Sequence, residues 1–121
     1  QTGMLPNHSI FTSLRFLDLS NNQLTGETPK SIGLLHKLQY LYLQRNYLDG
    51  DITESHLSNL SKLKVLELTD NSLSLKFGST WISPFQLFTL GIASCKLGPS
   101  FPIWLQTQSR LSFLDISDAW D

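Results

Sequence analysis

The sequence predicts a solenoid of the α/β class, in which short coils of the chain stack side by side. The first observation is an apolar pattern, Leu-x-x-Leu-x-Leu-x-x-Asn-x-Leu, which starts at Leu14, Leu38 and Leu63. Looser copies start at Leu87 and Leu111. The second observation is the spacing, because successive copies start 24, 25, 24 and 24 residues apart. A fixed period of this length indicates a stack in which each coil buries its apolar residues against the next.

The pattern and its period are typical of leucine-rich repeats, which we expect over residues 1–121 as one domain. We expect a right-handed superhelix with a parallel concave β-sheet and short helical or irregular convex segments. The expected repeats cover residues 14–37, 38–62, 63–86 and 87–110, with partial repeats at 1–13 and 111–121. Because Gly3-Met4-Leu5-Pro6 matches the back half of a repeat, we interpret the chain as an internal part of a longer protein. Its end coils would then expose leucines to water.

The front half of each repeat predicts a short strand. Leu17 and Leu19 alternate with Asp18 and Ser20, which is the period of two expected of a half-buried strand. The later repeats keep this alternation with the pairs Leu41/Leu43, Leu66/Leu68, Leu90/Ile92 and Leu114/Ile116. Stacked coils would align these strands in a parallel sheet, about 4.8 Å apart. Full burial of one such leucine contributes roughly 1.5–3 kcal/mol.

A column of asparagines follows the strands. Asn22, Asn46 and Asn71 stand where the chain turns inward and leaves backbone groups without partners. An asparagine side chain both donates and accepts hydrogen bonds, so these residues are expected to satisfy that backbone. Cys95 occupies the same column in the fourth repeat, where we interpret it as a small buried residue of this structural ladder. A reactive thiol is the alternative.

The back half of the repeat reads Leu-x-Gly-x-x-Pro. Residues 24–29 have the motif in full, residues 48–53 keep the glycine, and residues 73–77 have lost both glycine and proline. Glycine permits a bend, and proline suits the start of a helical or irregular segment. We therefore expect short turns on the convex side, with five apolar side chains pointing into the core: Ile32, Leu35, Leu57, Leu60 and Leu105.

Composition and motifs favour a binding protein over an enzyme. The net charge of −1 gives no basic surface for nucleic acid, and no apolar run is long enough to span a bilayer. His8, His36 and His56 fall on back-half loops, far apart in the repeat. No catalytic grouping, metal-ligand spacing or phosphate-binding glycine loop is present. We expect no catalytic residues, no cofactor and no metal.

The strand residues that point away from the core are the candidate binding residues. Tyr40, Tyr42 and Arg45 belong to residue types enriched at interface hot spots. Phe16 and Phe113 would be exposed on the same concave face. We hypothesise that this face contacts a protein or peptide ligand through Asp18, Tyr40, Tyr42, Arg45 and Glu67. The alternative is that they are ordinary solvated residues in an inactive part of a long solenoid.

The back-half motif resembles the plant extracellular class of leucine-rich repeats. The segments Ile52–Leu63, Leu75–Leu87 and Cys95–Leu105 follow one another as in receptor-like proteins of plant immunity, including fungal-elicitor receptors. That resemblance implies an ectodomain at the plasma membrane, with an extracellular protein or peptide ligand and a co-receptor kinase. It also implies membrane anchoring through a segment absent from this chain. Two alternatives are a secreted protein similar to polygalacturonase inhibitors and the ectodomain of a receptor kinase.

Two asparagines lie in glycosylation sequons. They are Asn7, in Asn7-His8-Ser9, and Asn59, in Asn59-Leu60-Ser61. Both fall in the back half of a coil, so a glycan there would leave the strand face free. The alternative is that both are unmodified surface residues.

Overall fold

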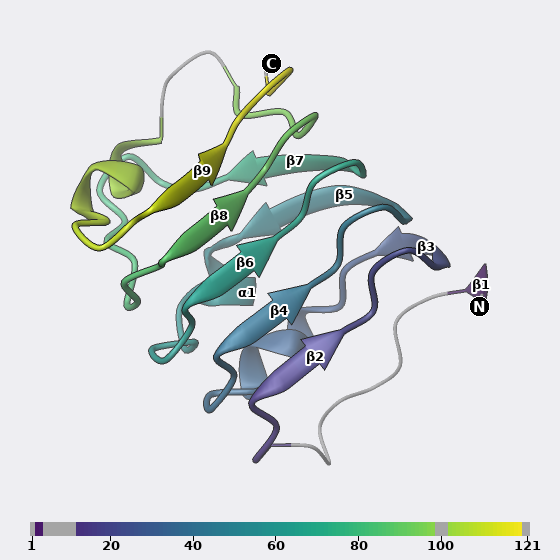
Figure 1. Ribbon diagram of the computed structural model, residues 1–121, viewed down its shortest axis with the longest axis horizontal. Coiled ribbons are helices and arrows are strands. Elements are labelled where there is room, and N and C mark those ends of the chain that lie inside the picture. The colour runs from purple at the N-terminus through teal and green to yellow at the C-terminus, as the bar shows by residue number, and fades with distance from the viewer. Residues whose placement is uncertain (1, 4–11, 99–101, 120–121) are drawn as a thin grey trace.

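Five parallel strands form one face of the molecule, as the leucine pattern predicts. The computed structural model describes residues 2–3, 12–98 and 102–119. The strands are β2 (Phe16–Asp18), β4 (Tyr40–Tyr42), β6 (Val65–Glu67), β8 (Thr89–Gly91) and β9 (Phe113–Asp115), and they lie side by side in that order (Figure 1). The alignment of the strand leucines is confirmed: Leu17 pairs with Leu41, Leu41 with Leu66, Leu66 with Leu90, and Leu90 with Leu114.

The inward leucines are buried where a coil has neighbours on both sides. Leu90 in β8 is fully buried, whereas Leu114, its partner in β9, is 41% exposed. Ile116 is also exposed. Among the described residues, a neighbouring coil packs on one side only of this strand, so the expected exposure at an end coil is confirmed there. Each coil is therefore buried by its neighbours, as in other stacked repeats.

A second parallel sheet was not predicted. It contains β1 (Thr2–Gly3), β3 (Gln23–Glu27), β5 (Tyr47–Thr53) and β7 (Ser72–Lys76), in that order, and lies behind the first sheet in Figure 1. The back halves were expected to hold only helical or irregular segments, and this expectation is incomplete. Glycine and aspartate are poor strand formers in isolation, but pairing with the adjacent coils overrides that preference. Gly26 and Gly50 have φ of 84° and 78°, a bend that glycine adopts without strain.

The convex side holds one-turn helices, as predicted. They are η1 (Lys30–Leu34), α1 (Glu54–Leu57) and η2 (Ile103–Thr107). The five back-half residues predicted to point into the core are all buried: Ile32, Leu35, Leu57, Leu60 and Leu105. In the described chain no helix has the length and apolar character needed to cross a membrane.

His56 lies in helix α1 and is buried, which corrects its predicted place on a loop. Its Nδ1 accepts a hydrogen bond from the Thr53 backbone N–H at 3.0 Å, and its Nε2 donates to the Thr28 carbonyl at 2.9 Å. The Thr53 side chain completes a capping box at the helix start. The histidine thus joins two successive coils, a role that its sequence position alone does not indicate.

Residues 77–86 have no helix, and aromatic rings fill the core behind them. The Phe77 and Trp81 rings stack with centroids 4.7 Å apart, and Trp104 packs edge-on against Phe77, Trp81 and Phe85. Hydrogen bonds fix this segment to the preceding coil. The Gly78 N–H donates to Glu54 Oε2 at 2.6 Å, and Trp81 Nε1 donates to a serine hydroxyl in that coil at 3.0 Å.

Candidate functional site

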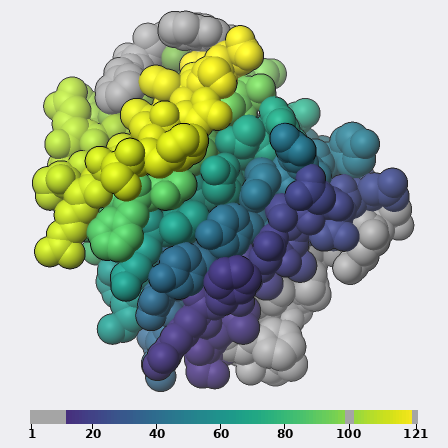
Figure 2. Space-filling model, viewed as in Figure 1, coloured from purple at the N-terminus to yellow at the C-terminus, as the bar shows by residue number. Residues whose placement is uncertain are grey.

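The outward side of the five-stranded sheet, named the strand face here, holds most of the predicted binding residues. Figure 2 shows this side of the molecule, with the strands running across it as parallel bands of colour. Strand register arranges the outward residues in two rows. One row contains Phe16, Tyr40, Val65, Thr89 and Phe113. The other contains Asp18, Tyr42, Glu67, Gly91 and Asp115.

Three aromatic rings gather at one end of the strand face. The Phe16 ring lies 5.8 Å from that of Tyr40 and 5.6 Å from that of Tyr42, measured between centroids. Phe16 is 55% exposed and the two tyrosines are half-buried. The tyrosines share one face because they are two residues apart in β4. The cluster offers an apolar surface with two hydroxyl groups that can form hydrogen bonds.

Glu67 lies in the middle of the strand face with its carboxylate leaning over Gly91. A Cβ atom at Gly91 would overlap both carboxylate oxygens, so the absent side chain makes room for Glu67. Its Oε1 is buried and has no hydrogen-bond partner among the described residues. Burial raises the pKa of Glu67, hydrogen bonds from Thr69 oppose the rise, and the charges of Asp115 and Asp70 add to it. The sequence predicted Glu67 as a binding residue, but not the position of its carboxylate over Gly91.

Asp18 and Asp115 form the same local hydrogen bonds in different coils. Each carboxylate accepts from the backbone N–H and the hydroxyl of a serine two residues later, Ser20 or Ser117. These bonds favour the ionised form and hold the pKa of both aspartates below the usual value. Both carboxylates therefore keep a negative charge at the edge of the strand face.

Arg45 lies in the turn after β4 and not among the strand residues. Its φ of 60° is left-handed, as are those of the equivalent residues in the other coils, Asn21, Asp70, Ser94 and Asp118. Arg45 Nε lies 3.8 Å from Asp70 Oδ2, and both side chains are exposed. The structure thus brings Asp18, Tyr42 and Glu67 into one row beside Tyr40, and places Arg45 at the border of that group.

The asparagine column binds the turns of successive coils. Asn46 Nδ2 donates to the carbonyls of Leu19 and Leu43, at 2.9 and 3.0 Å, and its Oδ1 accepts from the Leu24 N–H. Asn71 repeats the arrangement with Leu43, Leu68 and Leu48, and Asn22 donates to Leu19. Cys95 donates from Sγ to the Leu68 carbonyl at 3.7 Å. Burial raises the pKa of this thiol to about 12, which keeps it protonated.

One of the two predicted glycosylation sites lies among the described residues. Asn59 is exposed two residues after the end of α1, on the convex side, and Asn7 lies outside the described residues. Within residues 2–3, 12–98 and 102–119, no group of three histidine, cysteine or acidic side chains is arranged to hold a metal ion.

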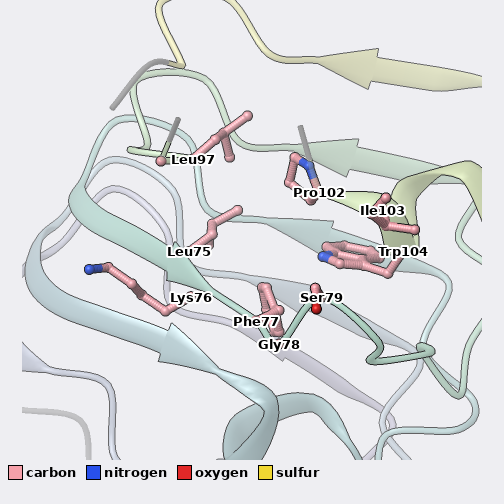
Figure 3. A pocket seen from close by; sticks show the side chains of 10 residues that line it. Leu75, Lys76, Phe77, Gly78, Ser79, Leu97, Pro102, Ile103 and Trp104 are labelled. Carbon is pink, nitrogen blue, oxygen red and sulfur yellow. The ribbon is translucent and has the colours of Figure 1, made fainter. Parts of the chain in front are cut away.

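A cleft of about 550 Å³ on the convex side was not predicted (Figure 3). It is lined by Leu75, Phe77, Leu97, Pro102 and Trp104, among others. In Figure 3 the indole of Trp104 points towards Phe77 and Leu75, whereas the Lys76 ammonium points away. We assign this cleft no ligand.

Comparison with known proteins places this geometry among leucine-rich-repeat receptors. A family model described as "Leucine Rich repeats (2 copies)" matches residues 12–55. Over 70 residues, 58% of this chain, the sequence is 59% identical to receptor-like protein EIX1 of Solanum lycopersicum. Over 109 residues, 88% of the chain, it is 38% identical to receptor-like protein 1 of Arabidopsis thaliana. The chain spans 7% and 10% of the lengths of these relatives.

Solved structures with the same fold include plant receptor ectodomains. The Arabidopsis receptor kinase HAESA, in complex with the peptide hormone IDA and the co-receptor SERK1, superposes with a TM-score of 0.80. The match has 30% identity and covers 95% of this chain and 19% of HAESA. The ectodomain of the Arabidopsis receptor kinase SOBIR1 gives a TM-score of 0.76 at 28% identity, covering 97% of this chain and 62% of that ectodomain.

Proposed function

Because the chain belongs to the family of plant leucine-rich-repeat receptor-like proteins, we propose that it is a ligand-recognition segment of a cell-surface receptor. The ligand is an extracellular protein or peptide, and the strand face is the contact surface. Binding leads to assembly with a partner kinase, in plant defence signalling. The family is one of receptors without enzymatic activity, so this segment recognises and does not catalyse.

The observation that carries this proposal is the cluster of half-exposed rings beside carboxylates. Phe16, Tyr40 and Tyr42 form a continuous aromatic surface, and Asp18 and Glu67 flank Tyr42 in the same row. Tyrosine is enriched at interface hot spots, where its ring contributes area and its hydroxyl contributes specificity. The HAESA complex, in which a similar fold holds a peptide hormone and a co-receptor, supports a peptide ligand.

The remaining parts of the proposal follow from the family. Anchoring in the plasma membrane and an extracellular position are inferred from the receptor-like relatives. Glycosylation is proposed at Asn59, whose exposed side chain lies on the convex side, and at Asn7. A glycan at Asn59 leaves the strand face accessible, because the two lie on opposite sides of the coil.

A receptor kinase is the second candidate function. It is favoured by one specific observation, that HAESA and SOBIR1 are receptor kinases with the same fold. In that case the ligand-binding segment keeps its role, and the kinase belongs to the same polypeptide. The identity to HAESA is 30%, whereas the identity to EIX1 is 59% over a shorter stretch. We therefore favour the receptor-like protein.

The strand face can be tested with a random peptide library displayed on phage and selected against the complete ectodomain that carries this chain. We expect the ectodomain to enrich peptides, and Tyr40→Ala with Tyr42→Ala to weaken their binding at least about tenfold. The matched control is Tyr47→Ala, because Tyr47 is an exposed tyrosine on the second sheet. Undiminished binding to the double variant would reject the strand face as the contact surface.

A further inference from the structure

We propose that an N-linked glycan on Asn59 lies against the convex side of the solenoid and covers three apolar side chains of the neighbouring coils, Leu34, Trp81 and Ile82. The inference rests on the proposed glycosylation of Asn59 and adds what the glycan does once it is attached. It comes from the place of the sequon Asn59-Leu60-Ser61 between two coils that each expose apolar groups beside it.

Asn59 occupies the same place in its coil as Leu34 does in the preceding coil. In both coils the N–H group of the next residue, Leu35 or Leu60, donates to the carbonyl three residues earlier, at 3.1 Å. Helix η1, which ends at Leu34, packs against α1, which ends two residues before Asn59. Leu34 is 49% exposed. Because successive coils stack in parallel, Leu34 and Asn59 are neighbours on the convex surface.

The following coil brings a second apolar group towards Asn59 from the opposite direction along the stack. Trp81 Nε1 donates to the hydroxyl of Ser58 at 3.0 Å, so the indole lies against the residue that precedes the sequon asparagine. The indole stacks on the Phe77 ring, but it is only half-buried. Ile82 follows it and is 74% exposed, the highest fraction of any large apolar side chain in the described chain. Asn59 therefore lies between exposed apolar groups of two coils.

The chemistry of an N-linked glycan suits this surface. Its first sugar, N-acetylglucosamine, presents C–H groups on the faces of its ring and polar groups at the edge. The faces can pack on an indole or an aliphatic side chain while the polar groups stay in water, as amphipathic side chains do. Such a contact is weak, but the covalent bond to Asn59 gives the sugar a high effective concentration at the surface. A protein partner would have to displace the attached glycan, so the glycan is the favoured occupant.

The cover would matter most for residues 77–86, which have no helix. Two exposed hydrogen bonds fix this segment to the preceding coil, from Trp81 to Ser58 at 3.0 Å and from the Gly78 N–H to Glu54 Oε2 at 2.6 Å. Solvent-exposed hydrogen bonds mark segments that open easily. A sugar over the indole would exclude water from the first of these bonds and hold the segment in place. The glycan would thus supply the cover that one-turn helices give elsewhere on the convex side.

The test is hydrogen exchange, measured by mass spectrometry, in the complete ectodomain produced with high-mannose glycans. Peptide mass mapping first establishes whether Asn59 carries a glycan. Asn59→Gln and Ser61→Ala both remove the sequon, and in both we expect the amides of residues 77–86 to exchange about tenfold faster. Ser61→Thr is the matched control, because it keeps the sequon and should leave exchange unchanged. Trimming the glycan to a single N-acetylglucosamine should preserve the protection, since the first sugar makes the contact.

The apolar contact is tested separately with Ile82→Ser, a substitution of an exposed residue. In that variant, loss of the glycan should accelerate exchange only about threefold, because part of the covered surface is gone. Ile103→Ser removes an exposed apolar side chain from another convex segment, η2, and should leave the effect of the glycan unchanged. Enzymatic removal of the whole glycan from the folded protein gives the same comparisons where a sequon variant is not secreted.

The outcomes separate this inference from the proposal on which it rests. An unmodified Asn59 would overturn both the cover and the proposed glycosylation, and would leave recognition by the strand face untouched. A modified Asn59 whose glycan can be removed without a change of exchange in residues 77–86 would overturn the cover alone. Equal acceleration in the parent and in Ile82→Ser would also overturn it, because the glycan would then act without the apolar contact.

Discussion

The two halves of the stack differ in how the backbone carbonyls of the inward turns are hydrogen-bonded. Wherever the chain turns inward after a strand, backbone carbonyls face the core and need donors. In the coils up to residue 76, asparagines supply them: Asn46 and Asn71 each bind carbonyls of two successive coils and one N–H group. In residues 77–119 that column holds Cys95, which makes one weak contact with the Leu68 carbonyl. In that turn the Cys95 backbone N–H donates to the Ile92 carbonyl at 3.1 Å, so the backbone itself pairs a carbonyl that the asparagine side chain pairs in the preceding coil.

Glutamine side chains join successive coils in the second half, at a different place from the asparagine column. Gln108 is buried, accepts from the Leu87 N–H at 2.8 Å and donates to the Ser83 hydroxyl at 2.7 Å. Gln86 is exposed, and its side chain donates to the Thr107 carbonyl and accepts from the Ser109 N–H. Successive coils are thus still joined by amide side chains, but on the convex side. Backbone groups are therefore hydrogen-bonded to amide side chains in both halves, by asparagines in the first and by glutamines in the second.

The largest difference between the halves should appear when the aromatic cluster is broken. Phe85 is fully buried and packs edge-on against Trp81 and Trp104. Phe85→Ala should lower the free energy of unfolding by about 3–5 kcal/mol, because it leaves a cavity where residues 77–86 have no helix to collapse into it. Urea unfolding followed by tryptophan fluorescence measures this loss. If Phe85→Ala lowered the free energy of unfolding less than Leu60→Ala does, the aromatic rings would not be the main source of stability in this half.

The asparagine column offers the next largest contrast. Asn71→Ala removes donors from two carbonyls and an acceptor from the Leu48 N–H, and should cost about 2–4 kcal/mol. Cys95→Ala removes one weak donor and should cost about 1 kcal/mol. Urea midpoints of the two variants check the order. Equal losses would mean that the asparagines contribute no more than a buried thiol.

One position in the first half should gain stability on substitution. Thr28 is 4% exposed, and its hydroxyl has no partner among the described residues. Ile52 fills the corresponding place in the following coil. Thr28→Val keeps the shape, removes the unpaired hydroxyl, and should raise the free energy of unfolding by about 1 kcal/mol. Thr28→Ser is the control, since it keeps the hydroxyl and should not stabilise the protein.

The smallest effect concerns the pH dependence of stability at the strand face. The pKa of Glu67 is raised in the folded state, so its ionised form opposes folding above that pKa. This destabilisation is present at neutral pH and is relieved as the pH falls through the folded-state pKa. Glu67→Gln should therefore be slightly more stable than the parent at pH 7 and equal to it in acid. Thermal melts across this pH range check the sign, and a variant that is less stable at pH 7 would contradict it.

The sequence predicted the parts of the fold that depend on periodic leucines. Residues such as Leu41 and Leu66 repeat at the coil period, so their alignment follows from stacking alone. The second sheet could not be predicted, because Asp49, Gly50 and Asp51 disfavour strands until neighbouring coils pair with them. The buried place of His56 was also missed, since it depends on the carbonyl of Thr28 in another coil.

The strand face was predicted as a set of columns, and its internal geometry was not. Alternation within strands was enough to place Tyr40, Tyr42 and Glu67 outward. The Glu67 carboxylate lies over Gly91 because this glycine, two coils from Tyr42, has no side chain to fill the space. Arg45 was grouped with the strand residues, although its left-handed backbone places it in the turn. The columns read from the sequence thus predict which residues share a face, but not which side-chain groups contact one another.

Photo-cross-linking of a selected peptide to the complete ectodomain tests the role of the strand face most directly. A photoreactive benzoyl-phenylalanine replaces either Tyr42, on the strand face, or Tyr47, which is exposed on the second sheet. We expect the peptide to be captured from position 42 and not from position 47. Capture from position 47 alone would contradict recognition by the strand face.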